Sequence, residues 1–336
     1  MFKMIKTGIS YYGSHFSDHI EDDMKNIAKH NCSYIVIAAS EFDLSFYFPS
    51  IKKIAEIAKK NGLEVFLDFW AHGGTFGGEA ASFFVMHNPR TCQISNRKRW
   101  IPSACHNNPR FQGFMLRTIE KCCTKLDIDG IFIDEPHFYF NPEKGVWGCR
   151  CRHCKSLFRK KYGTDMPTEL TKQVKKFRYE SSKAIIKKFC SYIKEINPKL
   201  LVTVCSKRSR RPMLTGVKWG DVCSLPSVDI FGSTTYWVRK KRYVKPESRV
   251  GKITQAIVNC TKRYGKKSEV WVQLFRLGKG REDEIARAID IAASYKPDRI
   301  ATWTFKGAEN SILSCADPAK AWKILGKVYE KLRKQK

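Results

Sequence analysis

The amino-acid sequence predicts a single (β/α)8 TIM barrel, in which eight parallel strands close into a ring surrounded by helices. Short apolar or β-branched runs alternate with longer amphipathic runs about eight times along the 336 residues. This alternation is typical of parallel strands joined by crossover helices, and such barrels usually occupy about 250 residues. The chain has no glycine-rich phosphate loop of the dinucleotide or Walker type, which disfavours an open nucleotide-binding sheet.

Each predicted strand is a short apolar segment bounded by turn-forming or charged residues. In chain order the predicted strands are Ile5–Tyr11, Tyr34–Ala38, Glu64–Phe69, Gly130–Asp134, Leu200–Cys205, Asp229–Ser233, Val270–Phe275 and Arg299–Phe305.

The predicted helices lie between these strands and end near glycine or proline, which stop helices. They are Asp18–His30, Ser50–Asn61, Pro109–Leu126, Phe177–Ile196, Ser248–Tyr264, Glu282–Tyr295 and Ala319–Lys334.

Two connections are long, about residues 70–108 after the third strand and 136–176 after the fourth. Both should emerge at the carboxyl-terminal face, where barrel enzymes build their active sites. Because both contain Trp, Phe and Cys, we expect them to fold onto the barrel mouth as part of one domain spanning residues 1–336.

The chain is strongly basic, with 62 Lys and Arg against 32 Asp and Glu and a formal net charge of +30. This charge favours acidic partners, although lysine-rich helices can also simply present a solvated face. The basic runs 207–211 and 239–243 could contact an anion. No nucleic-acid-binding module accompanies them, so nucleic acid is not the expected partner.

The thirteen cysteines indicate thiols and metal ligands rather than a disulfide framework, since their number is odd and the start of the chain does not read as a secretory signal. We therefore expect a cytoplasmic protein. No apolar run approaches the roughly 18–20 residues that a membrane span requires. The sequence does not decide the oligomeric state, and a homo-oligomer is compatible with it.

The fourth predicted strand runs directly into two carboxylates, Asp134 and Glu135. A carboxyl group at the end of a buried barrel strand can protonate a leaving oxygen or activate water, and glycoside hydrolysis needs two of them. The alternative is that these acids cap a turn or pair with an arginine. At the end of the fourth strand of a barrel, we favour the catalytic interpretation.

Other strand ends carry side chains suited to a sugar-binding cleft, because aromatic faces stack on sugar rings and polar groups orient hydroxyls. Arg276 and Lys306, just past the last two strands, could neutralise an acidic sugar, or they could be simple surface charge. The candidates for substrate contact or catalysis at these ends are Tyr11, Asp68, Trp70, His72, Tyr236, Gln273, Trp303 and Glu309.

Cys149, Cys151 and Cys154 form a Cys-X-Cys-X-X-Cys segment, which can share one tetrahedral zinc ion if a fourth ligand approaches. Cys105, in the other long connection, is the leading fourth ligand, and Cys92, His106 and His153 are alternatives. Four cysteines would make a closed, structural site. The alternative is a set of free thiols.

In chain order, Cys105-His106-Asn107-Asn108-Pro109, then Asp129–Pro136, then Cys149–Cys154 and Phe158–Gly163 together resemble the family 42 β-galactosidases and related glycoside hydrolases. The resemblance is close over about residues 105–167 and elsewhere extends only to the barrel rhythm. It implies structural zinc at Cys105, Cys149, Cys151 and Cys154. It also implies Glu135 as the acid/base, with Asp134 contacting the sugar where the family has Asn.

The chain departs from this family at the seventh strand. The family's nucleophile there is a glutamate, whereas this strand reads Val270-Trp271-Val272-Gln273 and Glu269 lies at its opposite end. The second carboxylate must come from elsewhere, and the candidates are Asp68, Glu309, Glu41, Asp43 or Asp134. We expect a glycoside hydrolase with Glu135, Asp134 and Asp68 in the leading roles, or alternatively a carbohydrate-binding barrel that has lost hydrolysis.

Overall fold

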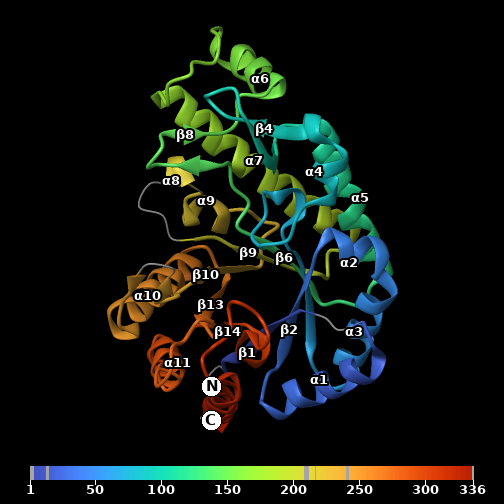
Figure 1. Cartoon of the computed structure of the whole chain (residues 1–336), viewed down its shortest axis with the longest axis vertical. Coiled ribbons are helices and arrows are strands. Elements are labelled where there is room, and N and C mark those ends of the chain that lie inside the picture. Colours follow the sequence, from blue (N-terminus) through green and yellow to red (C-terminus); the bar gives the residue numbers. More distant parts are fainter. Residues whose placement is uncertain (1–3, 13–14, 208–211, 216, 240–241, 335–336) are drawn as a thin grey trace.

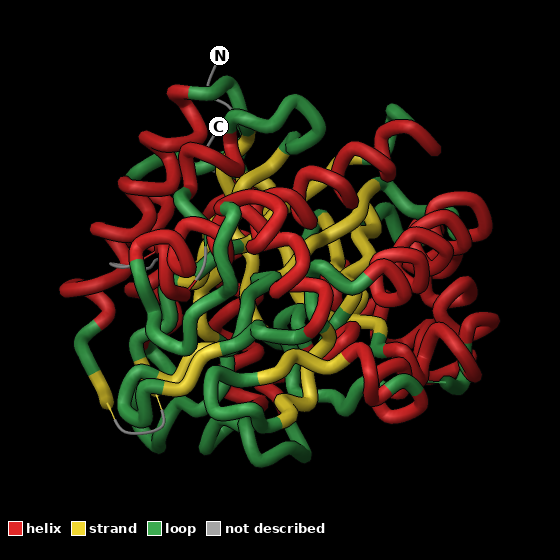
Figure 2. Tube along the Cα trace, turned by 90° about the horizontal axis from the view of Figure 1, so that it is seen from above, coloured by secondary structure: helices red, strands yellow, loops and turns green. Residues whose placement is uncertain are grey.

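The predicted barrel is confirmed by the computed structural model, which describes residues 4–12, 15–207, 212–215, 217–239 and 242–334. Eight parallel strands form a closed barrel in the order β1-β14-β13-β10-β9-β6-β3-β2 (Figure 1). Figure 2 shows the strands enclosed by helices. The barrel strands are β1 Lys6–Tyr11, β2 Tyr34–Ala39, β3 Glu64–Phe69, β6 Gly130–Asp134, β9 Leu201–Cys205, β10 Ile230–Thr234, β13 Lys267–Gln273 and β14 Arg299–Trp303.

All seven predicted helices are present, with ends shifted by a few residues. Thr171 accepts a hydrogen bond from the Val174 N–H, and this cap starts α7 five residues earlier than predicted. The long helices are α1 Ser17–Lys29, α3 Phe48–Lys60, α5 Pro109–Lys125, α7 Lys172–Ile196, α10 Pro246–Arg263, α11 Glu284–Ser294 and α12 Pro318–Lys334.

The sequence did not predict the shorter elements, most of which lie in the connections at the barrel mouth. Five are α-helices, namely α2 Glu41–Phe46, α4 Phe83–His87, α6 Arg152–Tyr162, α8 Pro212–Thr215 and α9 Trp219–Cys223. Three are 3-10 helices, η1 His72–Gly74, η2 Pro89–Thr91 and η3 Phe305–Ala308. The small hairpins are β4 Cys92–Ile94 with β5 Trp100–Ala104, β7 Phe140–Asn141 with β8 Val146–Trp147, and β11 Val238–Arg239 with β12 Arg242–Tyr243.

The two long connections share a small apolar core of their own. Phe138, Trp147, Phe158 and Phe177 pack there around the buried cysteines. The buried guanidinium of Arg178 on α7 donates to the Gly148 carbonyl at 2.6 Å and to the Tyr139 carbonyl at 3.0 Å. This layer therefore adds to the barrel at the top of the view in Figure 1, beside α6 and α7.

The amino-terminal end of the barrel interior contains buried charges of opposite sign that lie close together. Glu269 accepts hydrogen bonds from the Tyr34 hydroxyl and the Trp271 indole, both at 2.8 Å. Arg299 lies 3.7 Å from Glu269 and 2.6 Å from Glu64. As the sequence predicted, Glu269 is far from the mouth along β13, so it is no catalytic partner there.

Two further sequence expectations concern charge and membranes. Of the basic runs, residues 208–211 and 240–241 lie outside the described part of the chain. Among the described helices, none is both long and apolar enough to cross a membrane.

The tightest packing inside the barrel is between β1 and β2. A Cβ placed on Gly8 would lie 2.1 Å from the ring of Tyr34, and the Tyr34 hydroxyl is held by Glu269. Replacing Gly8 by Ala should therefore lower the free energy of unfolding by about 1–3 kcal/mol, because neither backbone nor ring can yield cheaply.

The control for this substitution is Gly113→Ala in the middle of α5, where a Cβ meets only the mobile tip of Arg117. It should raise the free energy of unfolding by about 0.5–1 kcal/mol. Chemical denaturation measures both values. Equal behaviour of the two variants would contradict the packing described here.

Candidate functional site

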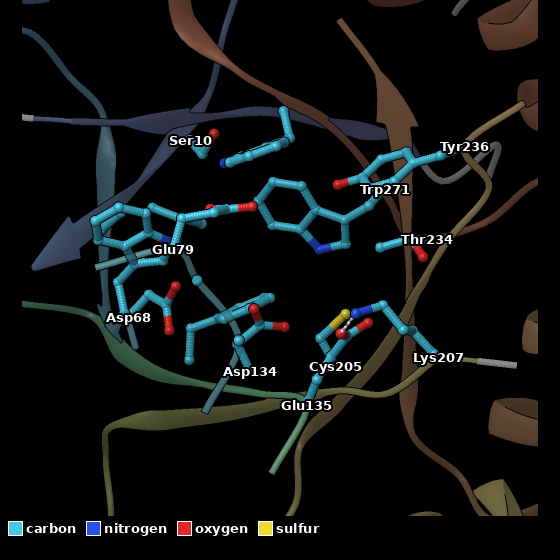
Figure 3. Close-up of a pocket in the computed structure, with 17 residues that line it drawn as sticks. Ser10, Asp68, Glu79, Asp134, Glu135, Cys205, Lys207, Thr234, Tyr236 and Trp271 are labelled. Carbon is cyan, nitrogen blue, oxygen red and sulfur yellow. Dashed lines mark ion pairs between the residues drawn. The ribbon is translucent and has the colours of Figure 1, made fainter. Parts of the chain in front are cut away.

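A cavity of about 130 Å³ opens at the carboxyl-terminal mouth of the barrel. Its wall combines carboxylates with aromatic rings, and it includes all three residues predicted to be catalytic, Asp68, Asp134 and Glu135 (Figure 3). The other polar and aromatic side chains of the lining are Ser10, Trp70, Glu79, Phe132, Cys205, Lys207, Thr234, Tyr236, Trp271 and Trp303.

Asp134 is the last residue of β6, and Glu135 follows in the left-handed backbone region with φ +43°. The Glu135 N–H donates to the Cys205 carbonyl at 3.0 Å, which fixes this turn against the end of β9. One side-chain oxygen from each acid and the Cys205 sulfur lie within 4.8 Å of one another. The two adjacent acids therefore share one small space.

Lys207 is the one basic side chain in the described lining of the cavity. It forms an ion pair with Glu135, whose side chain is buried while that of Lys207 is largely exposed. The lysine thus compensates one of two neighbouring carboxyl groups and approaches it from the end of β9.

Burial, reinforced by the neighbouring Glu135 charge, raises the pKa of Asp134 from 3.8 to about 8. Burial also raises the pKa of Asp68 well above its usual range, with Asp134 and then Glu135 adding to the effect. Like charges in a poorly solvated site resist joint ionisation. Asp134 is therefore mostly protonated at neutral pH, and burial and the neighbouring acids favour the protonated form of Asp68 as well.

Two carboxyl oxygens at the mouth lack a hydrogen-bond partner among the described residues. They are Oδ1 of Asp68 and Oε1 of Glu135, and both are buried. Buried polar atoms are nearly always hydrogen-bonded in folded proteins, so unpartnered acceptors in a cavity wall suit the hydroxyls of a bound molecule or ordered water.

The connection after β3 approaches Asp134 closely enough to require glycine. The Gly77 N–H donates to the Asp134 carbonyl at 2.9 Å, and a Cβ on Gly77 would lie 1.9 Å from Asp134 Oδ2. This close approach of the loop helps to exclude water from Asp134. The pKa of Asp134 is raised mainly because the side chain is desolvated.

Aromatic rings form much of the remaining wall. Tyr12 lies edge-on to Trp70 at 5.2 Å and to Trp303 at 5.9 Å, and the Trp303 indole donates to the Tyr12 hydroxyl. Desolvation, together with Asp68 and other acids, raises the pKa of Tyr12. Tyr12 is not part of the lining itself, but it supports Trp70 and Trp303, whose flat apolar faces suit a ring bearing hydroxyls.

Trp70, Tyr236 and Trp303 line the cavity as the sequence predicted, but four other predicted contacts do not. Tyr11 is buried against Phe305, and its hydroxyl donates to Asp23 at 2.9 Å. His72 is fully buried beside Phe69 and Phe114, where desolvation lowers its pKa. Glu309 is exposed and lines a separate hollow beside Trp322.

Gln273 is also absent from the cavity wall because its amide is fully used elsewhere. Its carbonyl oxygen accepts from the N–H groups of Trp237 and Val238, both at 2.9 Å. Its amino group donates to the carbonyls of Val238 and Phe275 at 3.2 and 2.9 Å. The resemblance implies a nucleophile at this strand end, but Gln273 instead holds neighbouring backbone segments in place through hydrogen bonds.

Of the other candidates for a second carboxylate, Glu41 and Asp43 are structural. Glu41 accepts from the N–H groups of Gly73 and Phe84, both at 2.6 Å, and from the Ser82 hydroxyl at 2.7 Å. Asp43 caps α2 together with Ser40. Only Asp68 and Asp134 among the named candidates reach the cavity beside Glu135.

The sequence interpretation missed Glu79, Lys207 and Trp271. Glu79 follows two pairs of glycines in the connection after β3, and no periodic pattern marks it. Lys207 lies two residues past β9, and this position near a strand end could have indicated that it reaches the barrel mouth. Trp271 points inward from the middle of β13, and a strand interior alone does not indicate a cavity wall.

Arg276 and Lys306, proposed to neutralise an acidic sugar, do not line the cavity, and Lys306 instead lies 3.6 Å from Asp23. The described lining contains four carboxylates and one lysine. An acidic sugar therefore has no electrostatic advantage at this mouth.

Cys105, Cys149, Cys151 and Cys154 come together as a buried cluster that could hold a metal ion. The Cys105 sulfur lies 3.4 Å from that of Cys154 and 3.6 Å from that of Cys151. Four thiolates around a zinc ion stand about 3.8 Å apart, since a Zn–S bond is about 2.3 Å, whereas a disulfide is about 2.05 Å. The spacing fits a metal.

Backbone N–H groups surround the cluster, as negatively charged sulfurs require. The Ile94 N–H lies 3.5 Å from the Cys149 sulfur, and the Cys151 N–H lies 3.3 Å from the same atom. The Asn107 N–H and side-chain amide approach Cys105 and Cys154, both at 3.4 Å. The three predicted alternatives to Cys105 as the fourth ligand, Cys92, His106 and His153, are not part of the cluster.

Comparisons with protein-family models and with curated proteins find no match. Solved structures do match, and several glycoside hydrolases are among them. One is a β-galactosidase from the Antarctic haloarchaeon Halorubrum lacusprofundi, with a TM-score of 0.77, 14% identity, and coverage of 99% of this chain and 58% of that one. The chain shares the TIM-barrel fold of these glycosidases.

The other matches agree. Gan42B, a family 42 β-galactosidase from G. stearothermophilus, gives a TM-score of 0.75 at 10% identity over 98% of this chain and 57% of that one. The catalytic domain of a Paenibacillus polymyxa β-amylase gives 0.66 at 8% identity over 97% and 98%. This chain thus spans less than two thirds of the length of both β-galactosidases.

The raised pKa of Asp134 has a consequence for stability. Its folded pKa of about 8 lies above the usual 3.8, so the protonated group contributes stability that is complete below about pH 4 and is lost as pH rises through about 8. At pH 9, Asp134→Asn should therefore be more stable than the wild type by roughly 2 kcal/mol.

Thermal unfolding at pH 5 and pH 9 measures this difference. Asp165→Asn serves as the control, because Asp165 is an exposed acid paired with Arg159, and it should keep the pH dependence of the wild type. Identical pH dependence of Asp134→Asn and the wild type would contradict the raised pKa.

Proposed function

We propose that this protein is a glycoside hydrolase whose proton-transfer group is the Asp134–Glu135 pair, with Glu135 as the general acid/base. The observation that carries this proposal is the crowding of Asp134 and Glu135 in one buried cavity, which raises the pKa of Asp134 to about 8. A glycosidase needs a carboxyl group that is still protonated at the working pH.

Adjacent carboxyl groups titrate as a pair, so the proton belongs to both rather than to a single oxygen. Asp134, with its raised pKa, supplies the proton near neutral pH, and Lys207 forms an ion pair with the neighbouring Glu135. The pair can deliver its proton to a leaving oxygen and later take one from water. Asp134 thereby assists Glu135, as the sequence suggested.

Asp68 is the leading second carboxylate. It lies at the end of β3, next to β6 in the barrel, and its unpartnered Oδ1 is buried in the cavity wall. A substrate carrying developing positive charge would favour its ionised form, since that charge offsets the neighbouring acids. Glu79 lines the same cavity and adds negative potential.

The substrate class that fits is a neutral glycoside, because the wall presents tryptophan faces, unpartnered acceptors and an excess of carboxylates. The names of the structural matches, β-galactosidase and β-amylase, support a carbohydrate substrate in general. The same features would also suit sugar binding without hydrolysis, which Gln273 favours by standing where a nucleophile is expected.

We further propose that the four-cysteine cluster holds a structural zinc ion. Cys105, Cys149, Cys151 and Cys154 would supply all four ligands, leaving no open position for chemistry. The metal would join the two long connections above the barrel. These connections share only a small apolar core, so the metal would add to their stability.

Replacement of Glu135 by Gln should lower turnover of an unactivated glycoside by about 10²–10⁴-fold, because an amide cannot pass a proton to the leaving oxygen or take one from water. The assay is a panel of oligosaccharides and aryl glycosides, with Glu143→Gln, an exposed acid in the same connection, as the control. Unchanged turnover by Glu135→Gln would defeat the assignment. Sugar binding by the wild type without hydrolysis of any panel member would favour the non-catalytic barrel.

Metal analysis should find about one zinc per chain, and Cys151→Ser should lower both zinc content and thermal stability. Cys260→Ser provides the comparison, because Cys260 lies 3.6 Å from Cys223 and outside the cluster, and it should keep its zinc. A purified wild-type protein without zinc, or a Cys151 variant of unchanged stability and zinc content, would rule the site out.

A further inference from the structure

A second and larger cavity, of about 550 Å³, lies where the two long connections meet. Three arginines line it, Arg90 from η2, Arg110 from α5 and Arg152 from α6, together with His87 and His153. The described lining contains no aspartate or glutamate. The cavity is therefore strongly basic, in contrast to the acidic barrel mouth.

Two of the arginines lie at helix amino termini, where their positive charge is repelled by the helix dipole. Arg110 follows Pro109 in the first turn of α5, and Arg152 is the first residue of α6. A helix amino terminus carries partial positive charge and is stabilised by acids, yet neither first turn contains one. The cysteine cluster can offset part of this charge at the start of α6, but the described lining supplies no acid to pair with the three guanidinium groups.

The start of α6 also leaves backbone donors available. Its cap residue, Cys151, offers the first turn only a sulfur, which interacts with the Cys154 N–H, whereas Asn108 caps α5 with an oxygen that accepts from the Arg110 N–H. The first N–H groups of a helix need such acceptors. An anion at this point would supply them.

The cysteine cluster holds the two helix starts in place. Cys105 precedes α5 by four residues, and its sulfur lies 3.4 Å from that of Cys154 in the first turn of α6. In Figure 1 α6 and the β4 region lie close together in the upper part of the molecule. The cavity is thus assembled by a fixed junction rather than by exposed side chains alone.

We propose that this cavity binds a phosphate or sulfate ester. Its charged oxygens would contact the forks of Arg90, Arg110 and Arg152 and the uncapped start of α6. The volume exceeds that of a bare oxyanion, so the organic part of the ester has room. This site is separate from the barrel mouth, and it does not depend on the chemistry proposed for Glu135.

The test is calorimetric titration of the full-length, metal-replete protein with glucose 6-phosphate and with glucose 6-sulfate, using glucose as the uncharged probe. Both esters should bind, and the triple variant Arg90→Gln, Arg110→Gln, Arg152→Gln should weaken their binding about tenfold or more. A phosphate or a sulfate preference identifies which ester the cavity takes. Esters that bind no better than glucose would overturn the proposal.

The control removes the same net charge elsewhere, through Lys52→Gln, Lys60→Gln and Lys187→Gln on exposed helix surfaces. It should leave affinity for the esters within about twofold of the wild type, because distant surface charges are screened by salt. Equal weakening by the two triple variants would mean that net charge alone binds the ester, which defeats the proposal.

Two further readouts separate this site from folding and from the barrel mouth. Without an ester, the arginine variant should melt at or above the wild-type temperature, because it removes cations from helix starts. An ester should raise the melting temperature of the wild type but not of this variant. Glu135→Gln should bind the esters unchanged, so loss of ester binding there would assign the ester to the barrel mouth instead.

Discussion

The pairing of β1 with β14 closes the sheet, and the arrangement of charge in this protein depends on that closure. Because all eight strands are parallel, one end of the barrel collects every strand start and the other every strand end. At the starts, Glu269 is satisfied by Tyr34, Trp271 and Arg299. At the ends, Asp68 and Asp134 have no comparable cation. The two ends of the barrel thus differ: Glu269 at the strand starts has hydrogen-bond and ion-pair partners, whereas Asp68 and Asp134 at the strand ends have no such cation.

This contrast distinguishes structural from chemical carboxyl groups more sharply than burial does. Glu41 and Glu269 are as buried as Asp68, yet their oxygens accept from fixed donors of the protein itself. Asp68 and Glu135 keep an oxygen without a partner among the described residues. Burying a polar group without a partner costs free energy, and proteins retain that cost mainly at functional sites.

The sequence predicted the elements of the barrel because each strand and helix signal is local: apolar runs, caps, glycine and proline. It also predicted the four-cysteine cluster, because the Cys-X-Cys-X-X-Cys spacing is itself a local pattern. It placed Tyr11, His72 and Gln273 at the cavity wrongly, because strand-end position does not decide which way a side chain faces. Lys207 and Glu79 were missed, because their positions depend on how irregular connections fold over the mouth.

The four hydrogen bonds of Gln273 bear on how the seventh strand end could have changed over time. A glutamate there would keep the acceptors for Trp237 and Val238 but lose both donors, leaving the carbonyls of Val238 and Phe275 unpaired. The loop after β10 is therefore held by the side-chain amide of Gln273. Placing an acid at this position would therefore require the loop to be rebuilt with it, so one substitution would not turn this strand end into a glutamate-bearing one.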